Sequence, residues 1–302
     1  MKSITLPLSN KQVDIKLNPL GIIEAKKEVK NARVFHAMYE MLKNGIEKID
    51  GQNPSYEEIK KLPYVDCEYI TFEIMRLNAI SSFMTMNGLC PICKSVHQFA
   101  ETRDSDTRIN LKNIEVKRSN GIDLEETYFT LKPYTQKQLL DVIRDIDEEY
   151  IDTYKEWTKY LKKYSTVKLE IKSITFRHPT LDDMLKAANT AKTDEDFNNK
   201  LYFNLIHDVE YTPDEIILES GEVEDIEDVK QFIAKYRFVE GGLLSFSWDR
   251  YYDRIQIGLH EFGLKPYFVH TCENCKNDYD QIYSFASFFA SGLLPSSVRA
   301  GV

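Results

Sequence analysis

Four of the five cysteines are the residues best placed to do chemistry, because they form two Cys-x-x-Cys pairs. Cys90 and Cys93 make the first pair, Cys272 and Cys275 make the second, and a lysine follows each pair. Zn²⁺ prefers four soft ligands in a tetrahedron, and one Cys-x-x-Cys turn, or knuckle, supplies two thiolates. We therefore predict that these four cysteines bind one structural zinc ion, since four thiolates leave no open position for catalysis.

The separation of the two pairs along the chain is unusual for such a site. Residues 94–271 lie between them, whereas the knuckles of a compact zinc ribbon are about 15–20 residues apart. One shared ion would therefore connect the chain near residue 90 to its C-terminal end. Because closing so long a loop removes much unfolded-state entropy, we expect the metal-free chain to be strongly destabilised.

Three other interpretations of the cysteines remain open. Each pair could bind its own metal with a nearby histidine, because His97 follows the first pair and His270 precedes the second. One or both pairs could be a redox dithiol, although no strand–Cys-x-x-Cys–helix arrangement surrounds the first pair. The cysteines could also be buried without a metal, a description that fits the lone Cys67 better than the paired ones.

Composition predicts a soluble protein of the reducing cytoplasm. The chain has 302 residues, of which 42% are hydrophobic, enough for one large core or two ordinary ones. No stretch approaches the roughly 20 apolar residues of a membrane-spanning helix, and the N-terminus lacks the apolar region of a secretory signal. In a reducing compartment, paired cysteines indicate a metal site more than disulfides.

The net charge of −9 argues against a nucleic-acid partner, because neutralising phosphates drives much of that binding. A zinc-ribbon nucleic-acid-binding protein or transcription factor is nevertheless the alternative function. It requires a basic face around the knuckles, for which Lys94, Lys265 and Lys276 are the candidates.

Hydrophobic periodicity predicts the elements that must position the cysteines. Alternating runs at 3–8 and 12–17 favour a hairpin, the pattern from 20 to about 46 is helical, and the clearest helix is 66–84 with Asp66 as its N-cap. We further expect a hairpin within 96–117, strands at 126–131, 167–176 and 267–270, and helices at 55–61, 135–164, 180–191, 194–208, 225–238 and 247–262.

These elements predict an α+β fold. It has a mostly helical body, short antiparallel strands or hairpins, and a split four-cysteine site like that of a zinc ribbon. We expect one interlocked unit with three parts. Residues 1–132 carry the hairpin, helices and first knuckle, residues 133–262 are a largely helical insertion, and residues 263–302 carry the second knuckle and the C-terminal tail.

The remaining polar residues suggest no enzyme. His178 and His207 stand alone in the pattern, and a capping or hydrogen-bonded core histidine explains each more simply than catalysis. The sequence has no nucleophile elbow, phosphate loop, dinucleotide fingerprint or HExxH motif. The acids of 135–164 lack a calcium-loop spacing and are typical of a solvated helix face. We therefore predict a non-enzymatic protein without a small-molecule substrate.

Several segments occur in an order that resembles a known family. They are Leu-Pro-Leu-Ser-Asn-Lys-Gln-Val at 6–13, the stretch Asp66–Ser81, the knuckle Cys90–Cys93, Phe-Arg-His-Pro-Thr at 176–180, Phe-Gly-Leu at 262–264, the knuckle Cys272–Cys275 and Ser-Phe-Ala-Ser-Phe-Phe at 284–289. Together they resemble the T4-type baseplate hub family of contractile-tailed bacteriophages. The most specific parts of the resemblance are 62–93 and 262–289.

The resemblance implies a role in virus assembly. Members of that family are small tail components or assembly factors near the baseplate centre, and several carry Cys-x-x-Cys knuckles. By resemblance, this chain is expected to be a structural or assembly component of the hub or inner baseplate that binds other baseplate and tail proteins. It would be assembled in the host cytoplasm and located in the virion. From its own residues, segment 283–302 is a contact candidate, and a packed terminal helix is an equally good interpretation of it.

Overall fold

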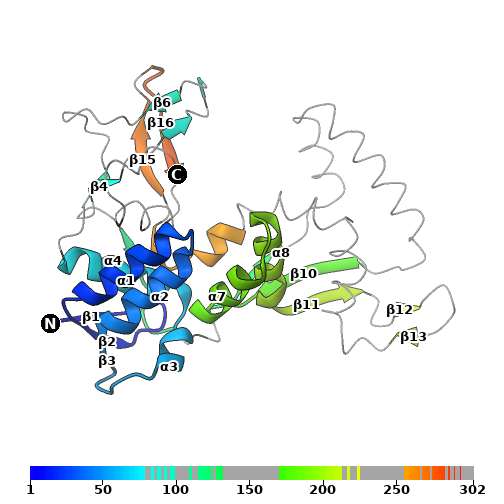
Figure 1. The fold of residues 1–302 in the computed structure, drawn as a ribbon. Coiled ribbons are helices and arrows are strands. Elements are labelled where there is room, and N and C mark those ends of the chain that lie inside the picture. Colours follow the sequence, from blue (N-terminus) through cyan, green and yellow to red (C-terminus); the bar gives the residue numbers. More distant parts are fainter. Residues whose placement is uncertain are drawn as a thin grey trace. The chain divides into compact units, whose positions relative to one another are not determined.

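The computed structural model describes two compact units (Figure 1). The first unit comprises Met1–Glu126, Pro179–Thr190 and Leu259–Val302, and the second comprises Thr127–His178 and Ala191–Gly258. The predicted divisions at residues 132 and 262 stay predictions. Within these units the structure describes residues 1–78, 83–84, 87–89, 92–93, 96–98, 109–110, 115–122, 124, 127–131, 170–212, 216–217, 223–224, 255–265, 267–272, 274–282, 285, 289 and 293.

A three-stranded antiparallel sheet begins the first unit. Its strands are β1 (Lys2–Thr5), β2 (Gln12–Ile15) and β3 (Ile46–Ile49), in the order β1-β2-β3. The predicted hairpin is confirmed, and β2 buries the alternating Val13 and Ile15. The strand β3 was not predicted, because its four residues directly follow a helix and continue its apolar pattern.

The helical pattern between 20 and 46 forms two helices, α1 (Pro19–Lys30) and α2 (Val34–Gly45), which pack against each other. They are separated where Ala32 adopts a left-handed conformation with φ 56°. The short helix α3 (Tyr56–Lys60) confirms the prediction at 55–61. Its N-terminus has a capping box, in which Ser55 and Glu58 bond each other's backbone N–H groups.

The central helix α4 (Tyr64–Leu77) begins before the predicted start. Pro63 occupies the N-cap, so the prediction of Asp66 as N-cap is wrong. The Asp66 carboxylate instead accepts the backbone N–H groups of Leu8 and Ser9, at 2.8 and 3.0 Å. The predicted end at residue 84 is also wrong, because α4 ends before Asn78 and Phe83–Met84 form strand β4.

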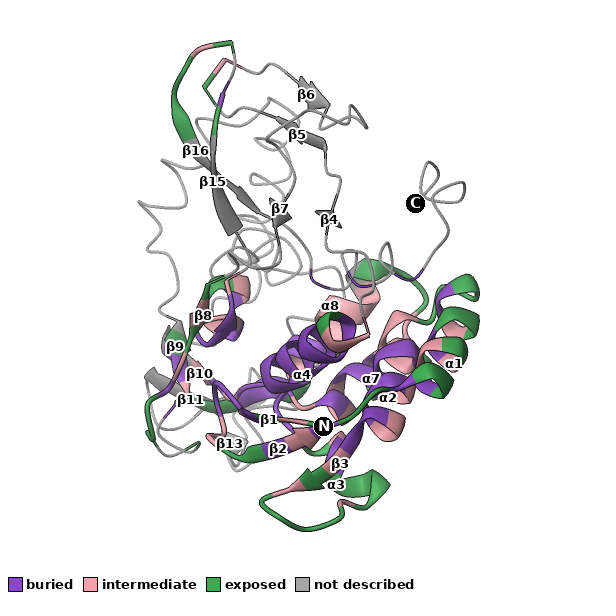
Figure 2. Cartoon of the chain, turned by 90° about the vertical axis from the view of Figure 1, so that its left-hand side faces the viewer, coloured by how far each residue is buried: buried purple, intermediate pink, exposed green. Residues whose placement is uncertain are grey.

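Helix α4 is buried on nearly every side, as Figure 2 shows. Its buried carboxylates therefore have partners inside the first unit. The carboxylate of Glu73 pairs with Lys2 and, at 2.8 Å, with Arg76. That of Glu68 lies 3.7 Å from Nε2 of His260. Helix α4 thus contacts other segments through the polar side chains of Lys2 and His260 as well as through apolar packing.

The short strands of the first unit pair differently from the prediction. The expected hairpin within 96–117 is wrong, because its strands have other partners. The structure pairs β4 with β7 (Ile109–Asn110), β5 (Asn87–Leu89) with β6 (Val96–Gln98), and β8 (Val116–Lys117) with β14 (Gly263–Leu264). Alternation along a strand reports which residues face the core and carries no information about the partner strand.

Helix α7 (Leu181–Thr190) also belongs to the first unit; it confirms the prediction at 180–191 and packs against α2, α3 and α4. Backbone hydrogen bonds join the start of α7 to the start of α4. The Tyr64 N–H donates to the Pro179 carbonyl at 2.7 Å. The N–H of Leu181 donates to the Leu62 carbonyl at 3.1 Å. These bonds fix the segment before α7 against the N-terminus of α4.

The second unit contains an antiparallel sheet in the order β11-β10-β9. Its strands β9 (Phe129–Leu131) and β10 (Glu170–Phe176) confirm the predicted strands, and β11 (Ile206–Thr212) directly follows helix α8 (Asp194–Leu205). The stacked rings of Phe129 and Phe176, with centroids 5.2 Å apart, lie on the buried face. A smaller pair is formed by β12 (Ile216–Ile217) and β13 (Val223–Glu224).

The helices and antiparallel strands confirm the α+β class. The predicted helices at 135–164 and 225–238 lie outside the described residues. Of the predicted helix 247–262, residues 255–259 are helical, while 260–262 form a turn that leads into β14.

Candidate metal centre

The second cysteine pair lies at the turn of a regular hairpin. Strands β15 (Tyr267–Thr271) and β16 (Asp278–Ile282) pair in antiparallel register, with Thr271 opposite Asp278 at the end nearest the cysteines. The Thr271 hydroxyl donates to the Asp278 carboxylate at 2.6 Å. The hairpin therefore holds the two ends of the Cys272–Cys275 knuckle close together.

Backbone hydrogen bonds give this turn the form of a metal knuckle. The N–H of Lys276 donates to the Cys272 carbonyl at 2.8 Å, and the N–H of Cys272 donates to the Asn277 carbonyl at 2.9 Å. The N–H of Cys275 points to the Cys272 sulfur at 3.4 Å. Lys276 has φ 60°, a conformation that favours glycine. N–H groups directed at sulfur stabilise a thiolate, which is the form that binds a metal.

The first pair also lies between two paired strands. Strand β5 ends at Leu89, which is opposite Val96 of β6, so residues 90–95 connect the two strands. Within this connection, Cys93 is half-buried, and Ile92 beside it is exposed. Cys90 lies outside the described residues.

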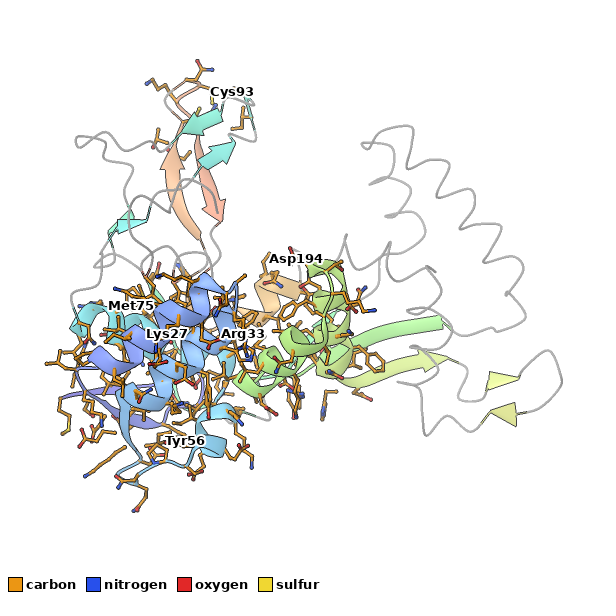
Figure 3. All side chains as sticks on the ribbon, viewed as in Figure 1. Lys27, Arg33, Tyr56, Met75, Cys93 and Asp194 are labelled. Atoms are coloured by element: carbon orange, nitrogen blue, oxygen red, sulfur yellow. The ribbon has the colours of Figure 1, made fainter. Side chains whose placement is uncertain are left out.

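Three of the four predicted ligands are brought together. Sulfur Sγ of Cys93 lies 3.6 Å from Sγ of Cys272, and all three sulfur atoms, including that of Cys275, are within 4.8 Å of one another. Figure 3 shows Cys93 beside the turn of the β15–β16 hairpin. Tetrahedral zinc with Zn–S bonds of about 2.3 Å separates its sulfur ligands by about 3.8 Å. The spacing of Cys93 and Cys272 matches that geometry, so the three cysteines could hold a metal ion.

The burial of the cluster also suits metal binding. Cys272 is completely buried, and the partly buried Cys93 and Cys275 pack against it. The side-chain amide of Asn274 donates to the Cys93 sulfur at 3.7 Å. The sequence did not predict Asn274 as a hydrogen-bond donor to the site. The only indication in the sequence was an amide side chain inside the second knuckle. A thiolate sulfur that accepts such a bond is oriented and less exposed to water.

The structure bears on the other interpretations of the cysteines to different degrees. Cys93 and Cys272 belong to different pairs, so their contact joins the two knuckles across residues 94–271. The side chains of His97 and His270 lie outside the described residues. Cys67 is buried in α4, and burial, with smaller contributions from Asp66 and Glu68, raises the pKa of its thiol well above the ordinary value. Cys67 is therefore an unreactive core thiol.

The structure describes the surroundings of the two histidines that stand alone in the sequence pattern. His178 is buried, and its Nε2 atom is hydrogen-bonded to the Thr127 carbonyl at 2.8 Å. His178 is therefore a buried core histidine that is hydrogen-bonded through Nε2. His207 is exposed, and its ring contacts that of Tyr128 at a tilt of 34°, with centroids 4.2 Å apart.

The lysines proposed as a basic face are only partly available. Lys265 pairs with Glu115 at 2.5 Å, Lys276 is exposed, and Lys94 lies outside the described residues. The ion pair of Lys265 offsets one of the three positive charges.

Among the described residues, no helix combines the length and apolar character needed to cross a membrane.

Comparisons with models of protein families, with curated proteins and with solved structures found no match.

Proposed function

We propose that this chain is a non-enzymatic structural or assembly component of the baseplate of a contractile phage tail, in its hub or inner part. One structural Zn²⁺ ion, bound by Cys90, Cys93, Cys272 and Cys275, would stabilise it. The observation that carries the metal site is the contact of 3.6 Å between the sulfur atoms of Cys93 and Cys272.

A shared ion explains that contact better than the alternatives do. Two separate sites, or a redox dithiol within one pair, do not require a sulfur of one knuckle to lie beside a sulfur of the other. A shared tetrahedral ion does require it. Cys90 would complete the site, because it precedes Cys93 by the same three residues that separate Cys272 from Cys275.

A metal at this place would act as a clip inside the first unit. It would join two segments between which residues 94–271 lie. In the chain-entropy picture, closing a loop of that length is worth about 5 kcal/mol. Such a clip suits a part that must stay folded within a larger assembly under mechanical load.

Support for the phage role comes from how the resembling segments pack. Leu8 and Phe262 belong to two of those segments, and they form one buried apolar cluster with Val65, which directly precedes the segment Asp66–Ser81. Pro179 belongs to a third segment, and its carbonyl accepts the N–H of Tyr64 at the start of α4. Segments that resemble one family in sequence order thus share contacts around α4, as a common structural unit requires.

The alternative of a zinc-ribbon nucleic-acid binder has less support. The chain carries a net charge of −9, and Lys265 is paired with Glu115. A protein that binds phosphates needs unneutralised cations at the contact surface.

Two experiments test the proposal separately. For the metal, elemental analysis of the purified chain should find one zinc per chain, and Cys272→Ser should lose it and loosen both knuckles together. A variant in which only the C-terminal knuckle is disturbed would contradict the shared site. For the role, mass spectrometry of purified particles and of baseplate intermediates from infected cells should detect the chain. Its absence from both would refute the baseplate assignment, whatever the metal content.

A further inference from the structure

The start of α1 exposes an apolar patch. Leu17, Leu20 and Ile23 are 62%, 59% and 53% exposed, and they follow one another at intervals of three residues. Leu20 and Ile23 lie one helical turn apart on the same face of α1. Figure 2 shows the exposed outer side of this helix. Exposed aliphatic side chains that gather in one place are typical of a contact surface, whereas scattered ones need no explanation.

Positive charge surrounds this patch, although the whole chain is acidic. Residues 16–33 contain five cations and two acids, so their net charge is +3, against −9 for the chain. Glu24 and Glu28 are paired with Lys27 and Arg33. In the part of the chain that the structure describes, the exposed cations Lys16, Lys26 and Lys30 have no ion pair. We call Lys16, Leu17, Leu20, Ile23, Lys26 and Lys30 the α1 surface.

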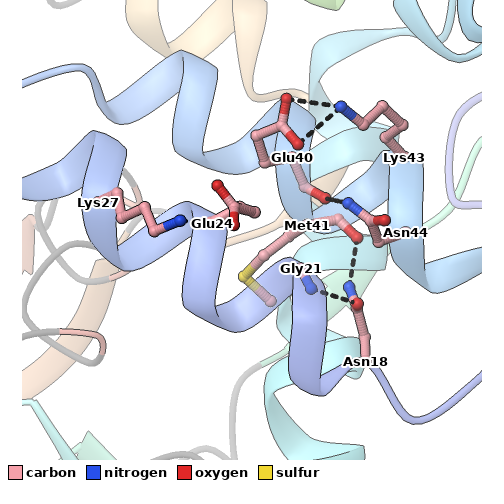
Figure 4. A network of polar contacts seen from close by, with 8 residues as sticks. All are labelled: Asn18, Gly21, Glu24, Lys27, Glu40, Met41, Lys43 and Asn44. Carbon is pink, nitrogen blue, oxygen red and sulfur yellow. Dashed lines mark hydrogen bonds and ion pairs between the residues drawn. The ribbon is translucent and has the colours of Figure 1, made fainter.

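The patch is held in a fixed conformation by the buried Asn18 (Figure 4). The side chain of Asn18 accepts the N–H of Gly21 at 2.8 Å and donates to the Met41 carbonyl at 2.7 Å. Its backbone N–H donates to the side chain of Asn78 at 3.0 Å. A Cβ atom on Gly21 would lie 2.2 Å from the Asn18 amide, so any larger residue there would displace the Asn18 side chain. Pre-organisation of this kind lowers the entropy cost of binding.

We propose that the α1 surface docks an acidic amphipathic helix of a partner protein. Apolar side chains of that helix would cover Leu17, Leu20 and Ile23, and its carboxylates would meet Lys16, Lys26 and Lys30. A central apolar anchor with a complementary charged rim is the usual organisation of a specific protein contact. The inference does not depend on the metal or on the phage assignment.

Two other occupants fit the α1 surface less well. A second copy of the chain, bound symmetrically through the same surface, would place lysines against lysines. A lipid surface takes up the whole apolar face of an interfacial helix, but Ala25 and Val29 of α1 are buried within the first unit. Three exposed aliphatic side chains make an anchor of the size that a protein groove accommodates.

The test uses the full-length chain and a synthetic probe. The probe is a fluorescent helical peptide of about five turns, with leucines on one face and glutamates beside them. A matched peptide carries lysine in place of every glutamate. Fluorescence anisotropy should show binding of the acidic peptide and not of the basic one, and the affinity should fall as salt is raised.

Variants of exposed residues then locate the contact. Leu20→Ser combined with Ile23→Ser should weaken binding of the acidic peptide by about tenfold or more. Lys26→Glu combined with Lys30→Glu should reverse the preference between the two peptides. The matched control is Ile257→Ser, because Ile257 is an apolar side chain 68% exposed elsewhere in the chain. It should bind the peptide as the unchanged chain does.

Several results would overturn the proposal. One is equal affinity of the unchanged chain and the Leu20→Ser, Ile23→Ser variant, and another is equal binding of both peptides. Binding to phosphatidylserine vesicles through these residues, without binding of the acidic peptide, would assign the α1 surface to a membrane. A dimer in light scattering that the same double variant dissociates would assign it to a second copy.

Discussion

Helix α4 and the cysteine cluster are stabilised in different ways. Twelve of the 14 residues of α4 are buried, so burial of side chains from several segments stabilises its surroundings. In the cysteine cluster, the partly buried hydrophobic residues that pack against the buried Cys272 are Cys93 and Cys275, among the residues that the structure describes. Short hairpins of this kind bury too little apolar surface to be stable alone. The comparison indicates that packing holds one region and that metal ligation would hold the other.

Removing the metal should have the largest effect and should separate the two regions. Cys272→Ser, or a chelator, should lower the free energy of unfolding by roughly 3–5 kcal/mol because the long loop is no longer closed. Hydrogen exchange should become fast in β5, β6, β15 and β16 before it does in α4. The control is Cys67→Ala, which removes a thiol outside the cluster and should keep the zinc. Loss of zinc from Cys67→Ala would contradict the assignment.

A cavity in α4 should produce the opposite pattern. Ile70 is completely buried, so Ile70→Ala should lower the free energy of unfolding by about 2–4 kcal/mol, measured by denaturant titration. The zinc content should be unchanged, because ligation does not depend on this side chain. If Ile70→Ala releases the metal at native conditions, the two regions are not independent.

Removing the contact between Asp66 of α4 and the first hairpin should change the free energy of unfolding by an intermediate amount that depends on pH. Asp66→Asn should cost about 1–2 kcal/mol at neutral pH, because an amide satisfies the N–H groups of Leu8 and Ser9 less well than a carboxylate.

The pH dependence follows from the pKa of Asp66. Burial raises this pKa above its ordinary value, although the hydrogen bonds from Ser9 and Leu8 oppose the shift. A raised pKa means that the folded chain binds the proton more tightly, so the contribution to stability grows as pH falls through the folded pKa. The unfolding free energy of the unchanged chain should therefore rise relative to Asp66→Asn between pH 7 and about pH 4. A difference that is constant over this range would contradict the raised pKa.

The smallest effect is expected at Asn274, within the cysteine cluster. Asn274→Ala removes the hydrogen bond to the Cys93 sulfur and should weaken metal affinity by about tenfold. Competition with a chromogenic chelator measures this change. Unfolding of α4 should be unaffected, and Asn277→Ala, which alters a neighbouring amide bonded to the Cys275 carbonyl, is the matched control.

Local patterns were sufficient for elements whose partners are close in sequence. The hairpin of β1 and β2, the capped helix α3 and the strand preceding Cys272 all follow from periodicity and turn residues within about ten positions. The residue types of the site were also readable, because two Cys-x-x-Cys pairs are rare without a metal. The helix predicted at 135–164 and the role of Cys90 as a fourth ligand stay predictions, because these residues lie outside the described residues.

Longer-range features required the folded chain. Three contacts join residues that are more than 50 positions apart in the sequence. They are the pairing of β8 with β14, the hydrogen bond from the Leu8 N–H to the Asp66 carboxylate, and the contact of Cys93 with Cys272. Periodicity shows which face of an element is buried but not which element covers it, so no local signal specifies these partners. The amino-acid sequence thus identified the cysteines as candidate ligands, and tertiary packing brought Cys93 close to Cys272 and Cys275.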